Sequence, residues 1–197
     1  HIKNENNIDI KSEEAPLYLA TKHGNFEIVK LLLTNDKLDI NIFNTTMYYS
    51  YEDKYNHDES NNEETTLFLA VKKKNIEIVK LLLTNDKLDI NLGYREFMEI
   101  LRQTRIEETP LYCAVEQGNI EIIKLLLAND KLDINHGFIK YTKYRGVTNT
   151  GIQKYEPHGW SYIYYSKYDQ DGNVSYKVDD VYSYDEQTPL DLAVAKG

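Results

Sequence analysis

Three nearly identical blocks of fifteen residues constrain this chain more than any other feature of its sequence. Residues 27–41 and 77–91 both read EIVKLLLTNDKLDIN, and residues 121–135 read EIIKLLLANDKLDIN. A shorter block precedes each long one and occurs a fourth time alone, as APLYLA, TTLFLA, TPLYCA and TPLDLA from Ala15, Thr65, Thr109 and Thr188. Self-similarity at this scale predicts a repeat architecture, which must be identified before any local structure is assigned.

Each block has the features of a short helix. In the first block, the hydroxyl of Thr109 or Thr188 can cap a helix N-terminus, and the Pro that follows fits the first helical turn. Gly24 and Gly118 then act as stop signals, with Lys74 in the equivalent place. In the second block, Ile, Val and Leu form an apolar stripe with helical spacing that ends at an Asn-Asp pair. Each unit is therefore predicted to be two antiparallel helices joined by a tight turn.

Neither helix of such a unit can bury its apolar stripe alone. A two-helix unit becomes stable only when it stacks on its neighbours, which gives a one-dimensional solenoid. We therefore expect the Leu-rich stripes to form the core between units, as helical stripes usually do, and not a groove for a partner.

The blocks resemble the ankyrin repeat. TPLYCA and TPLDLA are similar to its signature T-P-L-H-x-A, GNFEIVKLLL and GNIEIIKLLL are similar to its second helix, and LDIN is similar to its closing turn. The resemblance implies a mainly α fold, an ankyrin-type solenoid with long inter-repeat loops, over residues 1–197 as a single domain cut from a longer chain. The repeat units are expected at about 12–41, 64–91 and 107–135, with a truncated fourth unit at 187–197.

Three departures distinguish the chain from a plain ankyrin array. The signature His is replaced at every unit, and we expect Tyr18, Phe68 and Tyr112 to substitute for it by packing. The usual turn glycine is replaced by acidic pairs such as Glu63-Glu64 and Glu107-Glu108. The spacings between short blocks are 50, 44 and 79 residues, against about 33 in the family.

The additional residues all fall between LDIN and the next short block, where ankyrin repeats have a projecting finger loop. The inserts span about 42–63, 92–106 and 136–186. The first is predicted to form a short hairpin followed by a mobile segment around 57–62. The second has Phe97, Ile100 and Leu101 at helical spacing, which favours a short extra helix on the stack.

The third insert holds most of an excess of tyrosine, which numbers 17 against 5 Phe and 1 Trp. Two alternating segments flank an Asp-Gln-Asp-Gly turn, so a β-hairpin is predicted at about 159–180. Its rings can stabilise the hairpin through cross-strand pairs, or they can offer large, rigid contacts to a partner. Alternation presents two faces, so both roles remain open.

The predicted function is a non-catalytic protein–protein interaction module that presents these fingers to a protein partner. Per-repeat inserts on one face of a solenoid tend to decorate its binding side. The candidate contact residues are Tyr48, Tyr49, Tyr51, Tyr141, Tyr144, Trp160, Tyr162, Tyr164 and Tyr165. The resemblance further implies β-hydroxylation as a possible modification of Asn41, Asn91 and Asn135, each eight residues after a Leu.

Charge and composition argue against other classes of partner. A formal net charge of −9 opposes binding to nucleic acid or to anionic membrane surfaces, and favours a partner with some basic character. No apolar run is long enough for membrane insertion, and the expected location is intracellular, in the cytoplasm.

Catalytic and metal sites find little support in the sequence. The single cysteine, Cys113, lies in the apolar register of a first helix, as a buried structural thiol would. Asp169, Asp171 and Asn173 depart from the calcium-loop pattern, so neither a metal nor another cofactor is expected. Two alternative functions stay open: a passive spacer or rod that self-associates through its truncated C-terminal end, and, with less support, an enzyme with its chemistry in the third insert.

Overall fold

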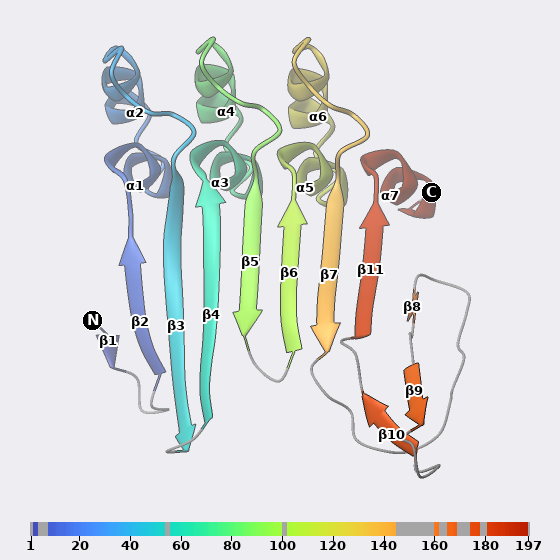
Figure 1. Ribbon diagram of the computed structural model, residues 1–197. Helices are drawn as coiled ribbons and strands as arrows, with labels where there is room; N and C mark the ends of the chain where they lie inside the picture. The colour runs from blue at the N-terminus through green and yellow to red at the C-terminus, as the bar shows by residue number, and fades with distance from the viewer. Residues whose placement is uncertain are drawn as a thin grey trace.

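The computed structural model of the chain describes residues 2–3, 8–53, 56–99, 102–144, 160–161, 165–168, 174–177 and 181–196. Helices stack side by side at one end of the molecule, and strands extend from them in a row (Figure 1). The inner helices are α1 (Pro16–Lys22), α3 (Thr66–Lys72), α5 (Pro110–Glu116) and α7 (Pro189–Lys196). The outer helices are α2 (Phe26–Leu33), α4 (Ile76–Leu83) and α6 (Ile120–Leu127).

The helices begin and end where local chemistry dictates. Thr65 and Thr109 cap α3 and α5, because each hydroxyl accepts a hydrogen bond from the amide three residues later, at 3.2 and 3.3 Å. The residues in the predicted stop position, Gly24, Lys74 and Gly118, all have positive φ, at 69°, 57° and 65°. The predicted helix–turn–helix units are therefore confirmed.

The core lies between the helices of each unit and between neighbouring units. Successive inner helices pack on one another, as do successive outer helices. The apolar stripes supply the fully buried side chains, including Leu17, Leu67, Ile78, Leu82 and Leu126. The interpretation of the stripes as core is confirmed.

Most strands of the inserts join in one antiparallel sheet, and β9 (Tyr165–Tyr168) and β10 (Val174–Lys177) form a separate two-stranded sheet. The order of the large sheet, among the described residues, is β1-β2-β3-β4-β5-β6-β7-β11-β8. The strands before and within the first two inserts are β1 (Ile2–Lys3), β2 (Ile8–Glu13), β3 (Phe43–Asp53), β4 (Asn56–Thr65), β5 (Tyr94–Glu99) and β6 (Arg102–Glu108). The strands of the third insert are β7 (Phe138–Tyr144), β8 (Trp160–Ser161), β9 (Tyr165–Tyr168), β10 (Val174–Lys177) and β11 (Val181–Gln187).

This sheet corrects several expectations. A mainly α fold is not confirmed, because every insert contributes strands. The extra helix in the second insert is wrong: Phe97 lies in β5, which pairs with β4 and β6. The mobile segment around 57–62 is also wrong, since β4 covers it and pairs along its length with β3. These strands gain ladder hydrogen bonds from the neighbouring finger, which helical spacing within one insert cannot reveal.

The third insert contains a hairpin, as predicted, and its described strands are β9 and β10. β9 pairs with β10, with Tyr165 opposite Lys177 and Tyr168 opposite Val174. Trp160, predicted in the first hairpin strand, instead lies in β8, opposite Ser183 of β11. β7 and β11 pair directly and continue the large sheet.

Candidate protein-interaction surface

Cross-strand pairing divides the sheet into two faces. Residues directly opposite one another in an antiparallel sheet share a face, and successive residues of one strand alternate between faces. The face nearest the inner helices is here named the helix-side face. Its first row, the one closest to the helices, runs across the strands through paired residues: Asn44, Glu64, Tyr94, Glu108, Phe138 and Gln187. The opposite face, named the back face, includes Phe97, Arg105, Tyr141 and Tyr184, also paired in one row.

The rings at the signature-His position join α1, α3 and α5 to the helix-side face. The Phe68 ring stacks on Tyr94, with centroids 5.7 Å apart, and Tyr112 stacks on Phe138 at 5.6 Å. The Tyr112 hydroxyl also donates to Gln187 Oε1 at 2.6 Å. Substitution of the signature His by packing is therefore observed at these two positions.

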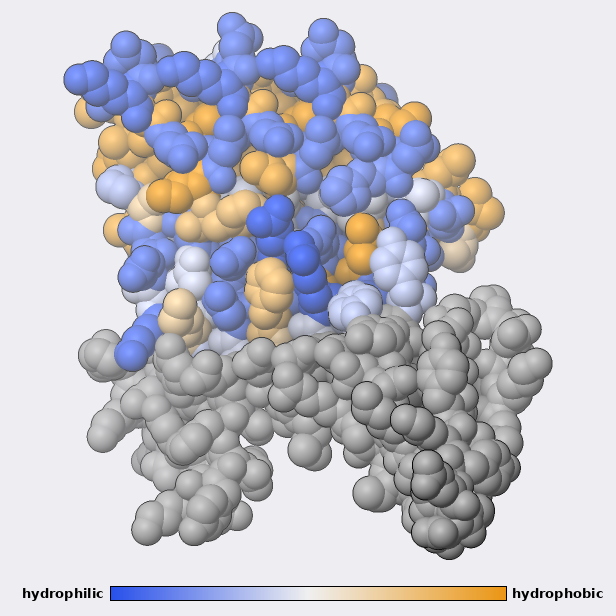
Figure 2. Space-filling model, viewed as in Figure 1, coloured by the Kyte–Doolittle hydropathy of each residue, from blue (hydrophilic) through white to orange (hydrophobic). Residues whose placement is uncertain are grey.

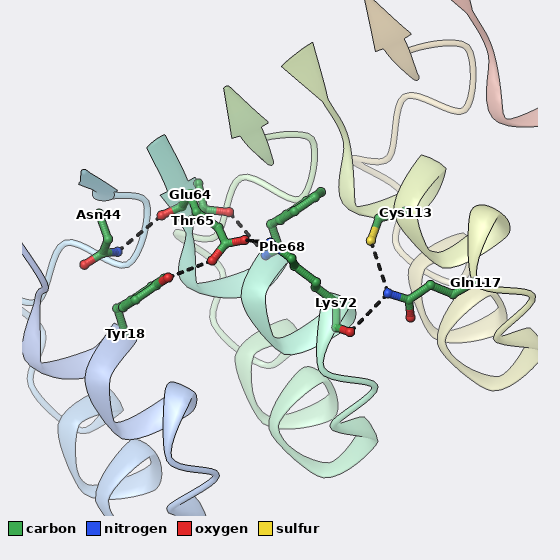
Figure 3. A network of polar contacts seen from close by, with 8 residues as sticks. All are labelled: Tyr18, Asn44, Glu64, Thr65, Phe68, Lys72, Cys113 and Gln117. Carbon is green, nitrogen blue, oxygen red and sulfur yellow. Dashed lines mark hydrogen bonds and ion pairs between the residues drawn. The ribbon is translucent and has the colours of Figure 1, made fainter. Parts of the chain in front are cut away.

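The first junction between repeats adds a charged network (Figure 3). The Tyr18 hydroxyl donates to Glu64 Oε2 at 2.7 Å, and Lys72 Nζ lies 3.0 Å from Glu64 Oε1. The same ammonium lies over the Phe68 and Tyr94 rings, 5.9 and 5.6 Å from their centroids. Burial, followed by the hydrogen bond to Glu64, raises the pKa of Tyr18, so this phenol remains a neutral donor.

The back face presents arginines lying on aromatic rings. The Arg95 guanidinium is 4.4 Å from the centroid of Phe43, and that of Arg105 is 5.4 Å from the centroid of Phe97. Arg105 also forms an ion pair with Glu107. Cation–π contacts at exposed sites contribute about 0.5–1 kcal/mol each, so these pairs hold both side chains flat on the sheet.

The predicted contact residues do not form one patch. Tyr48 is half-buried on the helix-side face, opposite Ile10 and Ser60, whereas Tyr141 lies on the back face, opposite Arg105 and Tyr184.

The other predicted contact residues are located by their backbones or lie outside the described residues. Tyr49 and Tyr51 lie in β3, Tyr144 ends β7, Trp160 begins β8 and Tyr165 begins β9. Tyr162 and Tyr164 lie outside the described residues, as does the Asp-Gln-Asp-Gly turn.

The asparagines predicted as modification sites connect neighbouring repeats. Asn41 Nδ2 donates to the Lys87 carbonyl at 2.8 Å, and the Asp89 amide donates to Asn41 Oδ1 at 2.8 Å. Asn91 makes the same two bonds to Lys131 and Asp133, at 2.9 and 2.8 Å. Each side chain thus joins one closing turn to the next. Hydroxylation of these residues stays a prediction.

The surroundings of the one cysteine do not favour a nucleophilic role. Cys113 is buried, and burial raises the pKa of its thiol to about 12, so the thiolate needed for nucleophilic attack is scarce. Within the described ranges, no three His, Cys, Asp or Glu side chains are grouped to hold a metal ion. The described part of the chain also contains no helix long and apolar enough to cross a membrane.

Sequence reasoning missed the residues that position the sheet. Tyr94 and Phe138 hold the fingers against the inner helices, and neither was singled out. A signal for them was present, because Tyr94 and Phe138 each lie three residues after the Asn that ends an LDIN block. This shared spacing could not be interpreted without knowing that each insert begins as a strand.

Comparison with known proteins agrees with the repeat geometry. The sequence model of a family described as ankyrin repeats in three copies matches residues 2–93 and again 46–137. No curated protein matches the chain. Ankyrin repeats generally serve as protein–protein interaction modules. The family matches cover well over half of the chain and include its three complete helix pairs, so the chain belongs to the ankyrin repeat family.

Proposed function

We propose that the chain is a non-catalytic protein-interaction module whose ankyrin scaffold presents extended Tyr-rich fingers to a protein partner. The observation that carries this proposal is the single-layer sheet. Its strands run away from the helices, and in the described part no helix covers either face beyond the first row, which packs on the inner helices (Figure 1). Antiparallel sheets usually bury one face against a core. A sheet held out in this way offers both faces to another molecule.

The chemistry of both faces suits a protein partner. Tyr48 and Tyr141 provide flat, rigid contact surfaces with a polar end, the side-chain type enriched at binding hot spots. Tyr49, Tyr51, Tyr144, Trp160, Tyr162, Tyr164 and Tyr165 are proposed as further contacts. The net charge of −9 favours a partner with a basic surface, which would be steered by long-range attraction.

A self-associating rod is the second candidate. The observation that favours it is the apolar outer side of α7, where Leu190 and Val194 are 70% and 75% exposed. Hydrophobic residues are visible on the surface over this end of the molecule (Figure 2). Light scattering on the purified chain distinguishes the candidates, because a rod grows with concentration and a module for other proteins stays monomeric.

The sheet itself suggests how to test the fingers. Tyr144 and Val181 are direct partners in the β7–β11 ladder. Residues 145–180 can therefore be replaced by Asn-Gly, which forms the two-residue turn that such a ladder accepts. We expect this variant to keep the helices and strands β1–β7 and β11 of the large sheet, with the two-residue edge strand β8 removed together with the insert. It should lose part of the set of proteins that the full chain captures from a native lysate.

A matched control is the replacement of Ile100-Leu101 by Asn-Gly, which introduces the same turn residues without removing an insert. This control is expected to capture the full set. If the 145–180 variant captures the same set of proteins as the full chain, and circular dichroism verifies its fold, the third insert has a structural role and is not part of the binding surface.

A further inference from the structure

The residue just before the N-cap of each following inner helix occupies an equivalent place at every junction between repeats. Glu64 and Glu108 precede the N-caps of α3 and α5, and Gln187 occupies the same place before α7. All three lie in the first row of the helix-side face. The junctions can therefore be compared residue by residue within one molecule.

At the first junction, the carboxylate has two partners. The Tyr18 hydroxyl of the preceding inner helix donates to Glu64, and Lys72 at the end of its own inner helix pairs with it (Figure 3). At the third junction, the neutral amide Gln187 receives the Tyr112 hydroxyl. In both cases a phenol from the preceding repeat satisfies the group.

At the second junction, Glu108 has lost both partners. Phe68 stands where Tyr18 and Tyr112 stand and has no hydroxyl, and Glu116 stands where Lys72 stands and carries the opposite charge. Glu108 Oε1 is buried and has no hydrogen-bond partner. The Cys113 thiol donates a hydrogen bond to this carboxyl, but a thiol is a weak donor and leaves Oε1 unpaired, so ionising Glu108 is unfavourable. The protonated form carries no charge and can itself donate.

The surroundings offer Glu108 little compensation. Lys72 is the nearest source of positive charge, but it is already bound to Glu64. Burial and then the charge of Glu116 raise the pKa of Glu108 to about 7. The titratable or charged groups that face it are Glu116, Cys113 and Tyr112 of α5, Lys72 of α3, Glu64 of β4 and Tyr94 of β5.

We propose that the protonation state of Glu108 controls whether the junction between the second and third repeats is closed or open. With a neutral Glu108, α3 and α5 pack closed over the first row of the sheet. When Glu108 ionises, the carboxylate needs water or a donor, and the junction opens to supply it. In a one-dimensional array each repeat contacts only its neighbours, so one weakened junction divides the stack into two halves.

The direction of the effect follows from linkage. The folded protein binds this proton more tightly than the unfolded chain, so the stabilisation is fully present below the ordinary glutamate range. It is lost as the pH rises through about 7. Glu108 remains partly open to solvent, which screens the effect, so we expect a change on the order of tenfold in the folding equilibrium constant between pH 5 and pH 8.

The test compares variants of the whole chain by urea unfolding at pH 5 to 8.5 and by carbon-13 titration of the glutamate carboxyls. Glu108→Gln is expected to abolish the loss of stability above pH 6. Phe68→Tyr restores the phenol and Glu116→Lys restores the ion pair, so each should move the Glu108 titration toward the ordinary glutamate range. Glu27→Gln is the control, because Glu27 is exposed on α2 and is not among the groups that face Glu108, so the Glu108 titration should stay in place.

Two results would overturn the proposal. One is a Glu108 carboxyl that titrates in the ordinary glutamate range in the unmodified chain. The other is an identical pH profile of unfolding for Glu108→Gln and the unmodified chain. Phe68 is buried and its Tyr variant could fail to fold, whereas Glu116 is exposed and its Lys variant keeps the test decisive.

Discussion

At the scale of single residues, Lys74 adopts a backbone conformation that two glycines adopt elsewhere. Its φ of 57° lies in the left-handed region, like those of Gly24 and Gly118 at the same place in the other repeats. The alignment of repeats predicted this equivalence from sequence. The inequivalence of Glu64 and Glu108 could not be predicted in the same way, because it depends on which side chains of the preceding repeat meet them in space.

Replacing Lys74 with glycine is expected to stabilise the chain by about 0.5–1 kcal/mol. A side chain in the left-handed region is strained, and glycine removes that strain at a smaller cost in unfolded-state entropy. Urea unfolding measures the difference. The reverse change, Gly118→Lys, should destabilise by a similar amount, and equal midpoints for both variants and the unmodified chain would contradict this account.

At the scale of elements, the helices were predictable and the strands of the second insert were not. Helix caps, stop residues and apolar stripes are local signals, and all lie within one repeat. β5 and β6 depend on partners on other fingers as well as on each other, and most of their described side chains are only partly buried, so their alternation of polar and apolar residues is weak.

Glycines place the start of each following strand against the inner helix of the repeat that has just ended. The Thr65 amide donates to the Gly93 carbonyl, and the Thr109 amide donates to the Gly137 carbonyl, both at 3.1 Å. The first repeat has Phe43 at this place, and there the Ala15 amide donates to the buried side chain of Asn44 instead, at 2.6 Å. Glycine therefore lets the two backbones come close enough for a direct hydrogen bond. In the first repeat the Asn44 side chain accepts the equivalent hydrogen bond instead.

Gly93→Ala is expected to destabilise the chain by about 3 kcal/mol, because a Cβ there would lie 1.9 Å from the Glu108 carbonyl oxygen and force β5 and β6 apart. The matched control is Gly118→Ala, where a Cβ meets nothing within 4 Å and only the strain of positive φ, about 1 kcal/mol, is added. Thermal unfolding followed by circular dichroism separates the two. Equal destabilisation would show that the strand has room to move.

At the scale of the whole molecule, stacking and not sequence sets the burial of each repeat. Ile28 and Ile78 occupy the same place in identical segments, yet Ile28 is 47% exposed and Ile78 is fully buried. Leu19 and Leu69 differ in the same direction, at 41% and 5%. The repeats could be found from sequence, but their unequal environments arise only when the array is assembled.

The unequal burial of equivalent residues predicts that local stability differs between repeats. The identical repeat segments provide an internal control for measuring this difference. Residues 27–41 and 77–91 are identical, so the amides at 28–33 and 78–83 have the same intrinsic exchange chemistry. α4 packs between α2 and α6, whereas among the described helices α2 has only α4 beside it in the outer layer. A repeat supported from one side opens at a lower free energy than one supported from both. Hydrogen exchange is therefore expected to be slower at 78–83 than at 28–33 by on the order of tenfold or more. Equal protection at the paired positions would mean that the stack opens as one cooperative unit, and a single weakened junction could then not divide it.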